Sequence, residues 1–365
     1  MTASLPDRPH LITGFPGLLA GQLLQEIAAE GQAPIHLLCL PAMADKARRQ
    51  IQRLDQELPG LANRVQIHRG DITRPRLGLD ETTYQSLTES IGLVWHLAAL
   101  YDLAVENQIA FRVNLGGTYE VLDFCEAADD LIRLNYISTC YVSGTRRGEI
   151  LESELDCGQR HHNHYESTKF WAEVEVQRRM ATLPTAIFRP GIVVGDSRTG
   201  KTAKYDGPYF IFQLLHRLPQ WMPFPNIGSG QAVVNLVPLD FVCTAIAHLG
   251  LHPKATSQVF QVADPHPMTA RQIVDAVLRH LDRKPARGQL PPSWVEQALE
   301  NKLVQAWSGI PPEALVYFNH DARYDTRATS AALQDTAIRC PHLSTYLPTL
   351  LDYFLRHPDS PPPLY

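Results

Sequence analysis

The sequence predicts an α/β fold, a doubly wound parallel sheet followed by a smaller C-terminal lobe. In the first half of the chain, short apolar runs alternate with amphipathic helical stretches, which is typical of a parallel sheet covered on both faces. After Gly195 this alternation lapses and prolines become frequent. We therefore expect a second lobe that packs over the strand ends, with some segments returning to complete the first domain.

The strands of the predicted sheet are short apolar runs separated by helical patterns. The first helix is expected over Leu18–Glu30, because Leu19, Leu23 and Ile27 share one face and Gly31 can end it. The expected strands are His10–Thr13, Ile35–Leu40, Val65–Arg69, Leu93–Leu97, Leu134–Ser138, Ala186–Arg189 and, as a seventh, Val259–Ala263.

Composition and charge limit the classes of function. The 33 Lys and Arg residues against 38 Asp and Glu residues give a net charge of -5, which provides no general field for attracting nucleic acid or an anionic membrane. There is neither a membrane-spanning apolar run nor a secretory signal, so we expect a cytoplasmic protein. The six cysteines are scattered, and His161, His162 and His164 are more simply a solvated loop than ligands, so no metal is expected.

A nucleotide-binding site is expected directly after the first strand. There the chain reads Thr13-Gly14-Phe15-Pro16-Gly17-Leu18, and a helix follows. Gly14 permits a tight turn, and Gly17 lets a pyrophosphate approach the backbone and the helix N-terminus. Because glycines also end many strands as simple turns, it is the strand before and the helix after that favour the nucleotide interpretation.

Two later strand ends fit the same cofactor. The third strand ends in Gly70-Asp71-Ile72, where the Asp71 carboxylate could accept a hydrogen bond from an adenine amino group. The fourth ends in Leu97-Ala98-Ala99, whose small residues would let the cofactor lie against the backbone. Taken singly, Asp71 is equally well a loop cap and the alanines equally well packing residues. Three fitting strand ends in the correct order favour a nicotinamide dinucleotide.

The sequence favours NADP over NAD without excluding NAD. An NAD site usually has an acidic residue closing the second strand, but here that strand ends in Cys39-Leu40-Pro41-Ala42. Downstream, Lys46, Arg48 and Arg49 could reach the 2′-phosphate of NADP, while Asp45 could hold a ribose. The alternative is a charged, solvated first turn of a helix.

The segment His164–Lys169 supplies a pair of catalytic candidates at the start of a helical stretch, Tyr165–Met180. Tyr165 and Lys169 are four residues apart and share a helix face. An ammonium group favours the ionised form of a nearby tyrosine, and a tyrosine tuned in this way can protonate a carbonyl oxygen as hydride arrives at carbon. The fifth strand ends beside Thr139, whose hydroxyl can hold the same oxygen. The alternative makes Thr139 a cap and Tyr165 a surface aromatic.

Together these motifs resemble the extended short-chain dehydrogenase/reductases, which have a Rossmann fold. Within them the likeness is to the thioester-reductase and fatty-acyl-reductase branch, the male-sterility type, and it runs over roughly residues 8–280 and more faintly through Pro341–Tyr353. The likeness rests on the segments TGFPGLLA, GDI, HLAA, STCYVSG, YESTK and RPGIVVG and, for the branch, on Pro75–Leu79, Asn114 with Gly117-Thr118, Gly195–Gly200, Asp206–Tyr209 and Asn235–Asp240.

The resemblance implies further roles for individual residues. Thr139, rather than Ser138, would be the catalytic hydroxyl, and Lys169 would also hold the nicotinamide ribose. The segment Pro190-Gly191-Ile192-Val193 would flank the nicotinamide, Asn114 would lie at the cofactor, and Asp240 would be structural, near the junction of the lobes. The arginine that this family often has at the end of the second strand is missing here, which keeps the choice between NADP and NAD open.

The implied activity is hydride transfer from NADPH or NADH to the carbonyl of an apolar acyl thioester or aldehyde, the thioester being bound to coenzyme A or to a separate carrier protein. The segment Tyr209–Phe224, with Phe210, Phe212, Trp221 and Met222, either lines the substrate pocket or is ordinary core. Two alternatives stay open: the same fold acting on a ketone, a sterol-like alcohol or a nucleotide sugar, and a catalytically silent dinucleotide sensor.

We expect the two lobes to hold different parts of the site. Residues 1–195 would form the NAD(P)-binding domain, completed by segments within about 233–263, and residues 196–232 and 264–365 would form the substrate-binding lobe. The expected partner is a small apolar carbonyl compound; nucleic acid is not expected, and a homodimer is compatible with the sequence.

Overall fold

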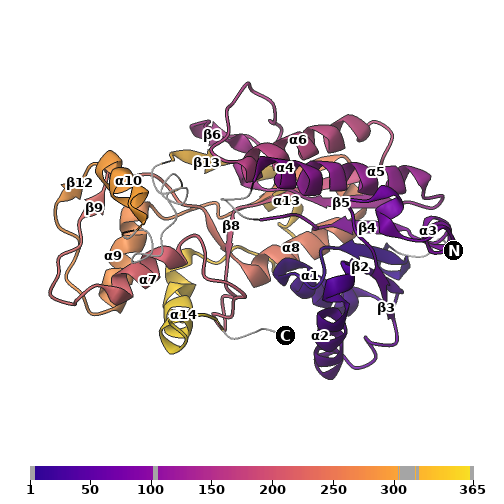
Figure 1. Cartoon of the computed structure of the whole chain (residues 1–365), viewed down its shortest axis with the longest axis horizontal. Coiled ribbons are helices and arrows are strands. Elements are labelled where there is room, and N and C mark those ends of the chain that lie inside the picture. Colours follow the sequence, from indigo (N-terminus) through magenta and orange to yellow (C-terminus); the bar gives the residue numbers. More distant parts are fainter. Residues whose placement is uncertain (1–4, 102–105, 303, 305–316, 318–319, 362–365) are drawn as a thin grey trace.

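The computed structural model describes residues 5–101, 106–302, 304, 317 and 320–361. Its centre is a seven-stranded parallel sheet with the order β11-β7-β5-β4-β1-β2-β3. Figure 1 labels four of these strands, β5, β4, β2 and β3, which follow one another in this order in the view. The chain runs outward from β1 to β3 in one direction and from β4 to β11 in the other, so the order reverses between β1 and β4. The strands are β1 (His10–Thr13), β2 (Ile35–Cys39), β3 (Val65–Arg69), β4 (Leu93–His96), β5 (Arg133–Ile137), β7 (Thr185–Pro190) and β11 (Gln258–Val262).

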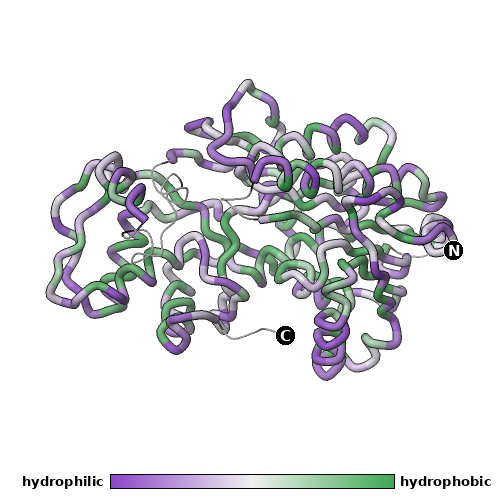
Figure 2. The backbone as a smooth tube through the Cα atoms, in the orientation of Figure 1, coloured by the Kyte–Doolittle hydropathy of each residue, from purple (hydrophilic) through white to green (hydrophobic). Residues whose placement is uncertain are grey.

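Helices cover both faces of this sheet, as a doubly wound fold requires. Helix α8 comes from far along the chain yet packs against α1 on one face, so the later sequence completes the first domain. Hydrophobic residues concentrate along the strands, while a peripheral helix such as α2 is largely hydrophilic (Figure 2). One face carries α1 (Leu18–Glu30), α2 (Ala44–Glu57) and α8 (Leu239–Leu251); the other carries α3 (Glu81–Thr88), α4 (Asn107–Ala110), α5 (Gly117–Ala127) and α6 (His164–Arg179).

The C-terminal lobe has a core of its own. It is built from α7 (Tyr209–Arg217), α9 (Ala270–His280) and α14 (Leu343–Arg356), which pack against the strand pair β8 and β10. The remaining elements are β8 (Ile192–Val194), β10 (Leu236–Pro238), β9 (Asn226–Ile227), β12 (Gln289–Leu290), α10 (Pro292–Glu300) and the short helical turns η1 (Leu5–Asp7), η2 (Pro41–Met43), η3 (Pro75–Gly78), η4 (Phe111–Gly116), η5 (Cys140–Ser143) and η6 (Pro253–Ala255).

Two segments from late in the chain return to the sheet domain. Strand β13 (Ala322–Tyr324) pairs in parallel with β6 (Gly148–Ile150), and α13 (Arg327–Ala332) packs on β11. Both fall inside the range 264–365 that the sequence assigns to the second lobe. That division of the chain into lobes stays a prediction.

The predicted fold class is confirmed. Each of the seven expected strands is present, with its ends within one residue of the expected position. The sequence locates them well because β1, β4, β5 and β7 are buried along their whole length and are therefore rich in apolar residues. In the part of the chain that the structure describes, no helix combines the length and the apolar composition needed to cross a membrane.

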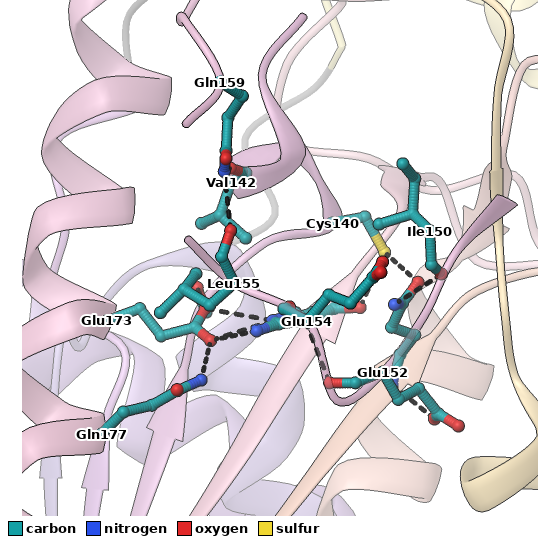
Figure 3. A network of polar contacts seen from close by, with 12 residues as sticks. Cys140, Val142, Ile150, Glu152, Glu154, Leu155, Gln159, Glu173 and Gln177 are labelled. Atoms are coloured by element: carbon teal, nitrogen blue, oxygen red, sulfur yellow. Dashed lines mark hydrogen bonds and ion pairs between the residues drawn. The ribbon is translucent and has the colours of Figure 1, made fainter. Parts of the chain in front are cut away.

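A buried ion pair connects the sheet to α6. Arg189 in β7 and Glu173 in α6 have side chains that are 2% and 0% exposed, and their closest nitrogen and oxygen atoms are 2.5 Å apart. Figure 3 shows the Glu173 side chain within this network of polar contacts. The Ser138 hydroxyl, at the end of β5, donates to the same carboxylate at 2.5 Å. The Arg189 guanidinium also donates to the backbone carbonyls of Glu152 and Glu154 at 3.2 and 2.9 Å. Both charges of this network therefore have partners.

A second buried carboxylate holds the returning helix α13. Glu152 is 6% exposed, and its oxygens accept from the backbone N–H groups of Gln261 in β11 and of Ala328 and Thr329 in the first turn of α13. A carboxylate at a helix N-terminus satisfies N–H groups that have no partner within the helix and interacts favourably with the helix dipole. Through Glu152, the loop before α6 is thereby attached both to strand β11 and to helix α13.

We predict that Glu173→Gln destabilises the protein by about 3–5 kcal/mol, because it leaves the Arg189 guanidinium buried and without its counter-charge. The matched control is Glu175→Gln on the same helix, since Glu175 pairs with Arg179 at 3.2 Å but is 15% exposed and should cost less than about 1 kcal/mol. Urea unfolding followed by circular dichroism measures both values. Equal losses in the two variants would contradict the importance of the buried pair.

Candidate active site

The turn after β1 brings the backbone of two strand ends into close contact. Gly14 has a φ of 86°, and a Cβ atom there would lie 2.8 Å from the Ala98 nitrogen and 2.9 Å from the Leu97 carbonyl carbon. A Cβ on Gly17 would lie 2.7 Å from the Gly14 oxygen. Gly17 is the N-cap of α1 and offers no side chain to the first N–H groups of the helix, which remain available to an anion. Between the glycines, Phe15 is buried.

Thr13 fixes this arrangement through its side chain. Its Oγ1 accepts hydrogen bonds from the backbone N–H groups of Leu97 and Ala98 at 3.2 and 3.1 Å, and it lies 2.8 Å from Nδ1 of His96. The ends of β1 and β4 are thus tied together at the point where the strand order reverses, which is where ligands bind in open α/β sheets. Five of the predicted cofactor residues, Thr13, Gly14, Gly17, Leu97 and Ala98, are therefore brought together.

The two residues after β3 have structural contacts of their own. Asp71 Oδ1 accepts from both the backbone N–H and the hydroxyl of Thr73, at 2.9 and 2.8 Å, so this carboxylate caps a turn. Ile72 is 8% exposed and packs on Gly117, where a Cβ would lie 2.4 Å from its Cδ1. The capping alternative for Asp71 is realised, and a contact with adenine stays a prediction.

Basic side chains gather around the end of β2, where the sequence lacks a ribose-binding acid. Arg48 is half exposed and pairs with Asp45 at 2.5 Å. Arg48, Arg49 and Arg69 all lower the pKa of Asp45, whose hydrogen bond to Arg48 is the largest cause. Arg69 is not among the residues that the sequence predicts for this site. It ends β3 in register with Cys39 at the end of β2, and that pairing between adjacent strands is visible only in the fold.

The predicted catalytic hydroxyls meet at the carboxyl edge of β5. Tyr165 lies in the first turn of α6, and the side chain of Thr139, the residue between β5 and η5, is close enough to the Tyr165 hydroxyl to lower its pKa. Burial of the hydroxyl raises the pKa of Tyr165, and Thr139 opposes this only in part. The Tyr165 ring is partly exposed and packs edge-on against Tyr101, with centroids 4.9 Å apart. A tyrosine in this environment keeps its proton at neutral pH.

Lys169 is buried one helical turn beyond Tyr165. Its ammonium group donates to the Tyr136 hydroxyl at 3.0 Å and to the Ile137 carbonyl at 2.8 Å, and it lies 4.5 Å from the centre of the Tyr136 ring. Burial lowers the pKa of Lys169 to about 7, an effect that Glu173 opposes. The expectation that Lys169 lowers the pKa of Tyr165 stays a prediction. The ammonium is held by β5, and burial dominates the pKa of Tyr165.

The side chains of Ser138 and Cys140, the two neighbours of Thr139 in the chain, make structural hydrogen bonds. The Ser138 hydroxyl donates to Glu173, as described above, and is thus unavailable to a ligand. The Cys140 side chain is 2% exposed, donates from Sγ to the Arg189 carbonyl at 3.1 Å, and has its pKa raised by burial. Thr139 is therefore the hydroxyl at this strand end that faces Tyr165, and Cys140 is poorly suited to act as a nucleophile.

The turn after β7 is held by contacts with Asn235, the residue before β10. Gly191 leaves no room for a side chain, since a Cβ would lie 2.7 Å from Oδ1 of Asn235. The Ile192 N–H donates to the Asn235 carbonyl at 2.9 Å, and the Asn235 amide makes two further hydrogen bonds to the backbone of Asp264. These contacts fix Pro190–Val193 at the strand end. Nearby, Asp240 accepts from the backbone and hydroxyl of Ser197 at 2.8 and 2.6 Å.

Other predicted residues lie elsewhere or have different contacts. Asn114 is 1% exposed; its Oδ1 accepts from the Leu100 N–H at 2.7 Å and its Nδ2 donates to the Thr168 hydroxyl at 3.0 Å. It thus anchors the segment after β4 to α6. Phe212 is 1% exposed in the core of the C-terminal lobe, and Trp221 is 79% exposed. The prediction that Tyr209–Phe224 lines a pocket is not supported for these two side chains, because Phe212 belongs to the core of the lobe and Trp221 lies on the surface.

In the histidine segment before α6, His162 contacts the buried carboxylate of Glu166. Glu166 is fully buried and accepts from the backbone N–H of His162 at 2.8 Å and from the Tyr317 hydroxyl at 2.7 Å, and it lies 3.0 Å from Nδ1 of His162. His161 instead stacks on Phe170, with ring centroids 4.7 Å apart. Among the described residues, no group of three His, Cys, Asp or Glu side chains is arranged to hold a metal ion.

A groove of about 380 Å³ lies between α9 and α14, well apart from these residues. Its lining includes Met268, Arg279, Leu347 and Leu351 and none of the predicted site residues. None of the residues that line the groove lies next to the glycine turn that is predicted to bind the dinucleotide. We therefore place the reaction at the carboxyl edge of the sheet.

Comparison with known proteins identifies the family. Residues 12–246, more than half of the chain, match the family described as "Male sterility protein". The chain belongs to this family. It is accordingly an NAD(P)-dependent oxidoreductase of the extended short-chain dehydrogenase/reductase type, as its motifs predict.

Individual relatives include both multidomain synthases and a fatty acyl-CoA reductase. The reductase is similar to the terminal R domain from the myxalamid PKS-NRPS biosynthetic pathway, with a TM-score of 0.81 and 25% identity, covering 98% of this chain and 92% of that one. A linear gramicidin synthase of Brevibacillus parabrevis is 25% identical over 95% of this chain, and fatty acyl-CoA reductase wat of Drosophila melanogaster is 27% identical over 64%. The reductase spans 7% and 52% of the length of these two relatives.

Two further residues lie near Tyr101, and the sequence alone assigns them no role in the predicted site. The Lys204 ammonium lies 5.5 Å from the centre of the Tyr101 ring, which itself packs on Tyr165, and it pairs with Asp206 at 3.2 Å. Burial raises the pKa of Asp206, and Lys204 opposes this. Asp206 begins the Asp206–Tyr209 motif that carries the family resemblance, so this motif contributes to the surroundings of the active site of the reductase.

We predict that Gly14→Ala weakens NAD(P)H binding on the order of tenfold or more, since the new Cβ would clash with the Ala98 backbone, and tenfold corresponds to about 1.4 kcal/mol. Gly60→Ala is the matched control. It imposes the same kind of backbone strain at a φ of 91°, but a Cβ there meets no atom within 4 Å. Fluorescence titration of NADPH and NADH measures both. A similar loss in the two variants would show that strain, rather than the close approach at Gly14, weakens binding.

Proposed function

We propose that the chain is a reductase that transfers hydride from NADPH to the carbonyl carbon of an apolar acyl thioester or of the derived aldehyde. The observation that carries this proposal is the pair of hydroxyls, Tyr165 and Thr139, which lie close enough at the strand edge for Thr139 to lower the pKa of Tyr165. Because burial keeps Tyr165 protonated, this residue is suited to donate a proton during reduction rather than to abstract one at rest.

In the proposed reaction, the chain binds and polarises the carbonyl. Thr139 and Tyr165 donate hydrogen bonds to the substrate oxygen, and Tyr165 transfers its proton to that oxygen. The bound nicotinamide supplies the hydride. A new C–H bond and a new O–H bond convert a thioester to a hemithioacetal, whose C–S bond breaks to release a thiol and an aldehyde. Lys169 supplies a buried positive charge that stabilises the phenolate left on Tyr165.

The acyl thioester is favoured by the relatives and by the chemistry of the cysteines. The curated relatives include a peptide synthase and a fatty acyl-CoA reductase, and one similar structure is a thiolation-reductase di-domain from an archaeal non-ribosomal peptide synthetase. Cys140, the cysteine next to Thr139, is buried with its pKa raised, which fits a route without an acyl-enzyme. We infer that the acyl group arrives on coenzyme A or on a carrier protein.

NADPH is the proposed cofactor on the basis of charge. Arg48, Arg49 and Arg69 surround the end of β2, and the segment that follows this strand has no acidic residue placed to bind both ribose hydroxyls. The nearby carboxylate of Asp45 is already paired with Arg48. A 2′-phosphate would meet two or three guanidinium groups, which bind such an anion through charge-assisted hydrogen bonds.

The test of the proposed activity is NADPH oxidation with acyl-coenzyme A esters, aldehydes and sugar nucleotides. We expect turnover with the thioesters and aldehydes, and a loss on the order of 10²-fold or more in Tyr165→Phe, with NADPH affinity nearly unchanged, because only the proton donor is removed. Ser138→Ala is the control for a hydroxyl one residue from Thr139 that contacts Glu173 instead. Activity with sugar nucleotides alone, or near-normal turnover by Tyr165→Phe, would refute the proposal.

The cofactor preference has its own test. We expect tighter binding of NADPH than of NADH, and loss of that difference when Arg48, Arg49 and Arg69 are all replaced by alanine, because each charge-assisted contact contributes roughly 1.5–3 kcal/mol. Replacing Arg53 on the same helix is the control for a general change in charge. Isothermal titration with both cofactors measures the affinities. Tighter NADH binding by the unmodified protein would refute the preference.

A further inference from the structure

Lys169 is held by acceptors from the strand beneath it. Its ammonium donates to the Tyr136 hydroxyl and to the Ile137 carbonyl, at 3.0 and 2.8 Å. An ammonium group has three protons. Two of them are thus committed to β5, which leaves one for a ribose hydroxyl or for Tyr165. The Tyr136 side chain is completely buried, so the direction of this lysine is set inside the core.

The contact with Tyr136 is the first link of a longer chain of buried polar groups. The Tyr136 ring packs against His96 in β4, with centroids 5.7 Å apart, and Thr118 in α5 is close enough to the Tyr136 hydroxyl to lower its pKa. Thr118 Oγ1 lies 3.1 Å from Nε2 of His96, and Nδ1 of His96 lies 2.8 Å from the Thr13 hydroxyl of the nucleotide loop. Thr118, His96 and Thr13 are 1%, 2% and 0% exposed. A continuous path therefore connects the lysine to the turn after β1.

Hydrogen-bond chemistry fixes the direction of the links on either side of His96. Thr118 donates to the Asn114 carbonyl at 2.6 Å, so its oxygen must accept from His96. Nε2 of His96 therefore carries the proton. Thr13 Oγ1 already accepts from two backbone N–H groups, so its own proton goes to Nδ1 of His96. This assignment requires a neutral imidazole, and burial lowers the pKa of His96 to about 3.

We propose that Tyr136 is a positioning residue for Lys169 and that, through Thr118 and His96, it ties the ammonium group to Thr13 of the nucleotide loop. The inference rests on the proposed function, because it takes Lys169 as part of the reducing site. Since the links on either side of His96 each have one allowed direction and two protons of the ammonium are committed to β5, the lysine is oriented before any cofactor binds. Disturbing the chain affects chemistry through the orientation and charge of Lys169, not through contact with substrate.

The groups facing Lys169 decide the sign of the effect of pH. They are Glu173 and Tyr165 on its own helix, Tyr136 on β5 and His96 on β4. The Tyr136 hydroxyl accepts from the charged form of the lysine and so favours it. Losing this acceptor should lower the pKa of Lys169 below its value of about 7. Turnover that needs the ammonium falls as pH rises through that pKa, so the fall moves to lower pH.

The test is Tyr136→Phe, which keeps the aromatic ring beside the ammonium and removes the hydroxyl. We expect kcat to fall on the order of tenfold, the NADPH affinity to change less than about threefold, and the alkaline limb of the pH–rate profile to move down by about one pH unit. Nuclear magnetic resonance of ¹³Cε-labelled lysine should show the same displacement for Lys169 without any substrate. Thr118→Val, which breaks the next link while keeping the volume, should give a smaller change of the same sign.

Tyr84→Phe is the matched control, since it removes a hydroxyl from a tyrosine that packs on the same hydrophobic cluster as Tyr136. It should leave the pH profile unchanged. A wild-type pH profile and lysine titration in folded Tyr136→Phe would overturn the inference. If Tyr136→Phe does not fold, an unchanged lysine titration in Thr118→Val overturns it instead. If the unmodified protein shows no turnover, only the proposed function is contradicted. The inference about Tyr136 is still tested by the lysine titration, because that measurement needs no substrate.

Discussion

The carboxylate of Glu173 and the guanidinium of Arg189 meet where α6, β5 and β7 come together, and neither side chain is exposed by more than 2%. Removing both charges from water costs free energy, which the structure offsets by giving each of them several further hydrogen bonds. Glu173 lies one helical turn from Lys169, and Arg189 immediately precedes the turn at Pro190. The Ser138 hydroxyl joins the same carboxylate next to Thr139. One interaction thus fixes helix α6, the proposed catalytic hydroxyl of Thr139 and the proposed nicotinamide turn relative to one another.

A second fixed point lies at the other side of the site. Thr13 binds the backbone after β4, and Gly14 allows the two strand ends to approach closely enough for that contact. The buried chain through His96 and Tyr136 joins this point to Lys169. The dinucleotide loop and the acid–base groups are therefore parts of one rigid edge. Such rigidity suits hydride transfer, because positioning of the reacting groups accounts for much of the rate enhancement.

The sequence was sufficient where local pattern decides the outcome. The buried strands, the glycine turn and the tyrosine–lysine spacing each depend on a few consecutive residues. It was insufficient where the fold brings several possible partners to one side chain, because the pattern does not show which of them the side chain contacts. The ammonium of Lys169 donates to two acceptors of β5, and the sequence pattern does not distinguish Tyr136, one of these acceptors, from the apolar residues of its strand. Arg69 is likewise adjacent to the end of β2 only because β3 pairs with it in register.

The most direct test of the account follows the hydride itself. Unmodified protein would be incubated with NADPH deuterated at the transferred position and an acyl-coenzyme A ester, and both product and protein would be analysed by mass spectrometry. The account predicts deuterium on the former carbonyl carbon of the released aldehyde or alcohol and a protein of unchanged mass. Product without deuterium, or an acyl group retained on a cysteine, would contradict it.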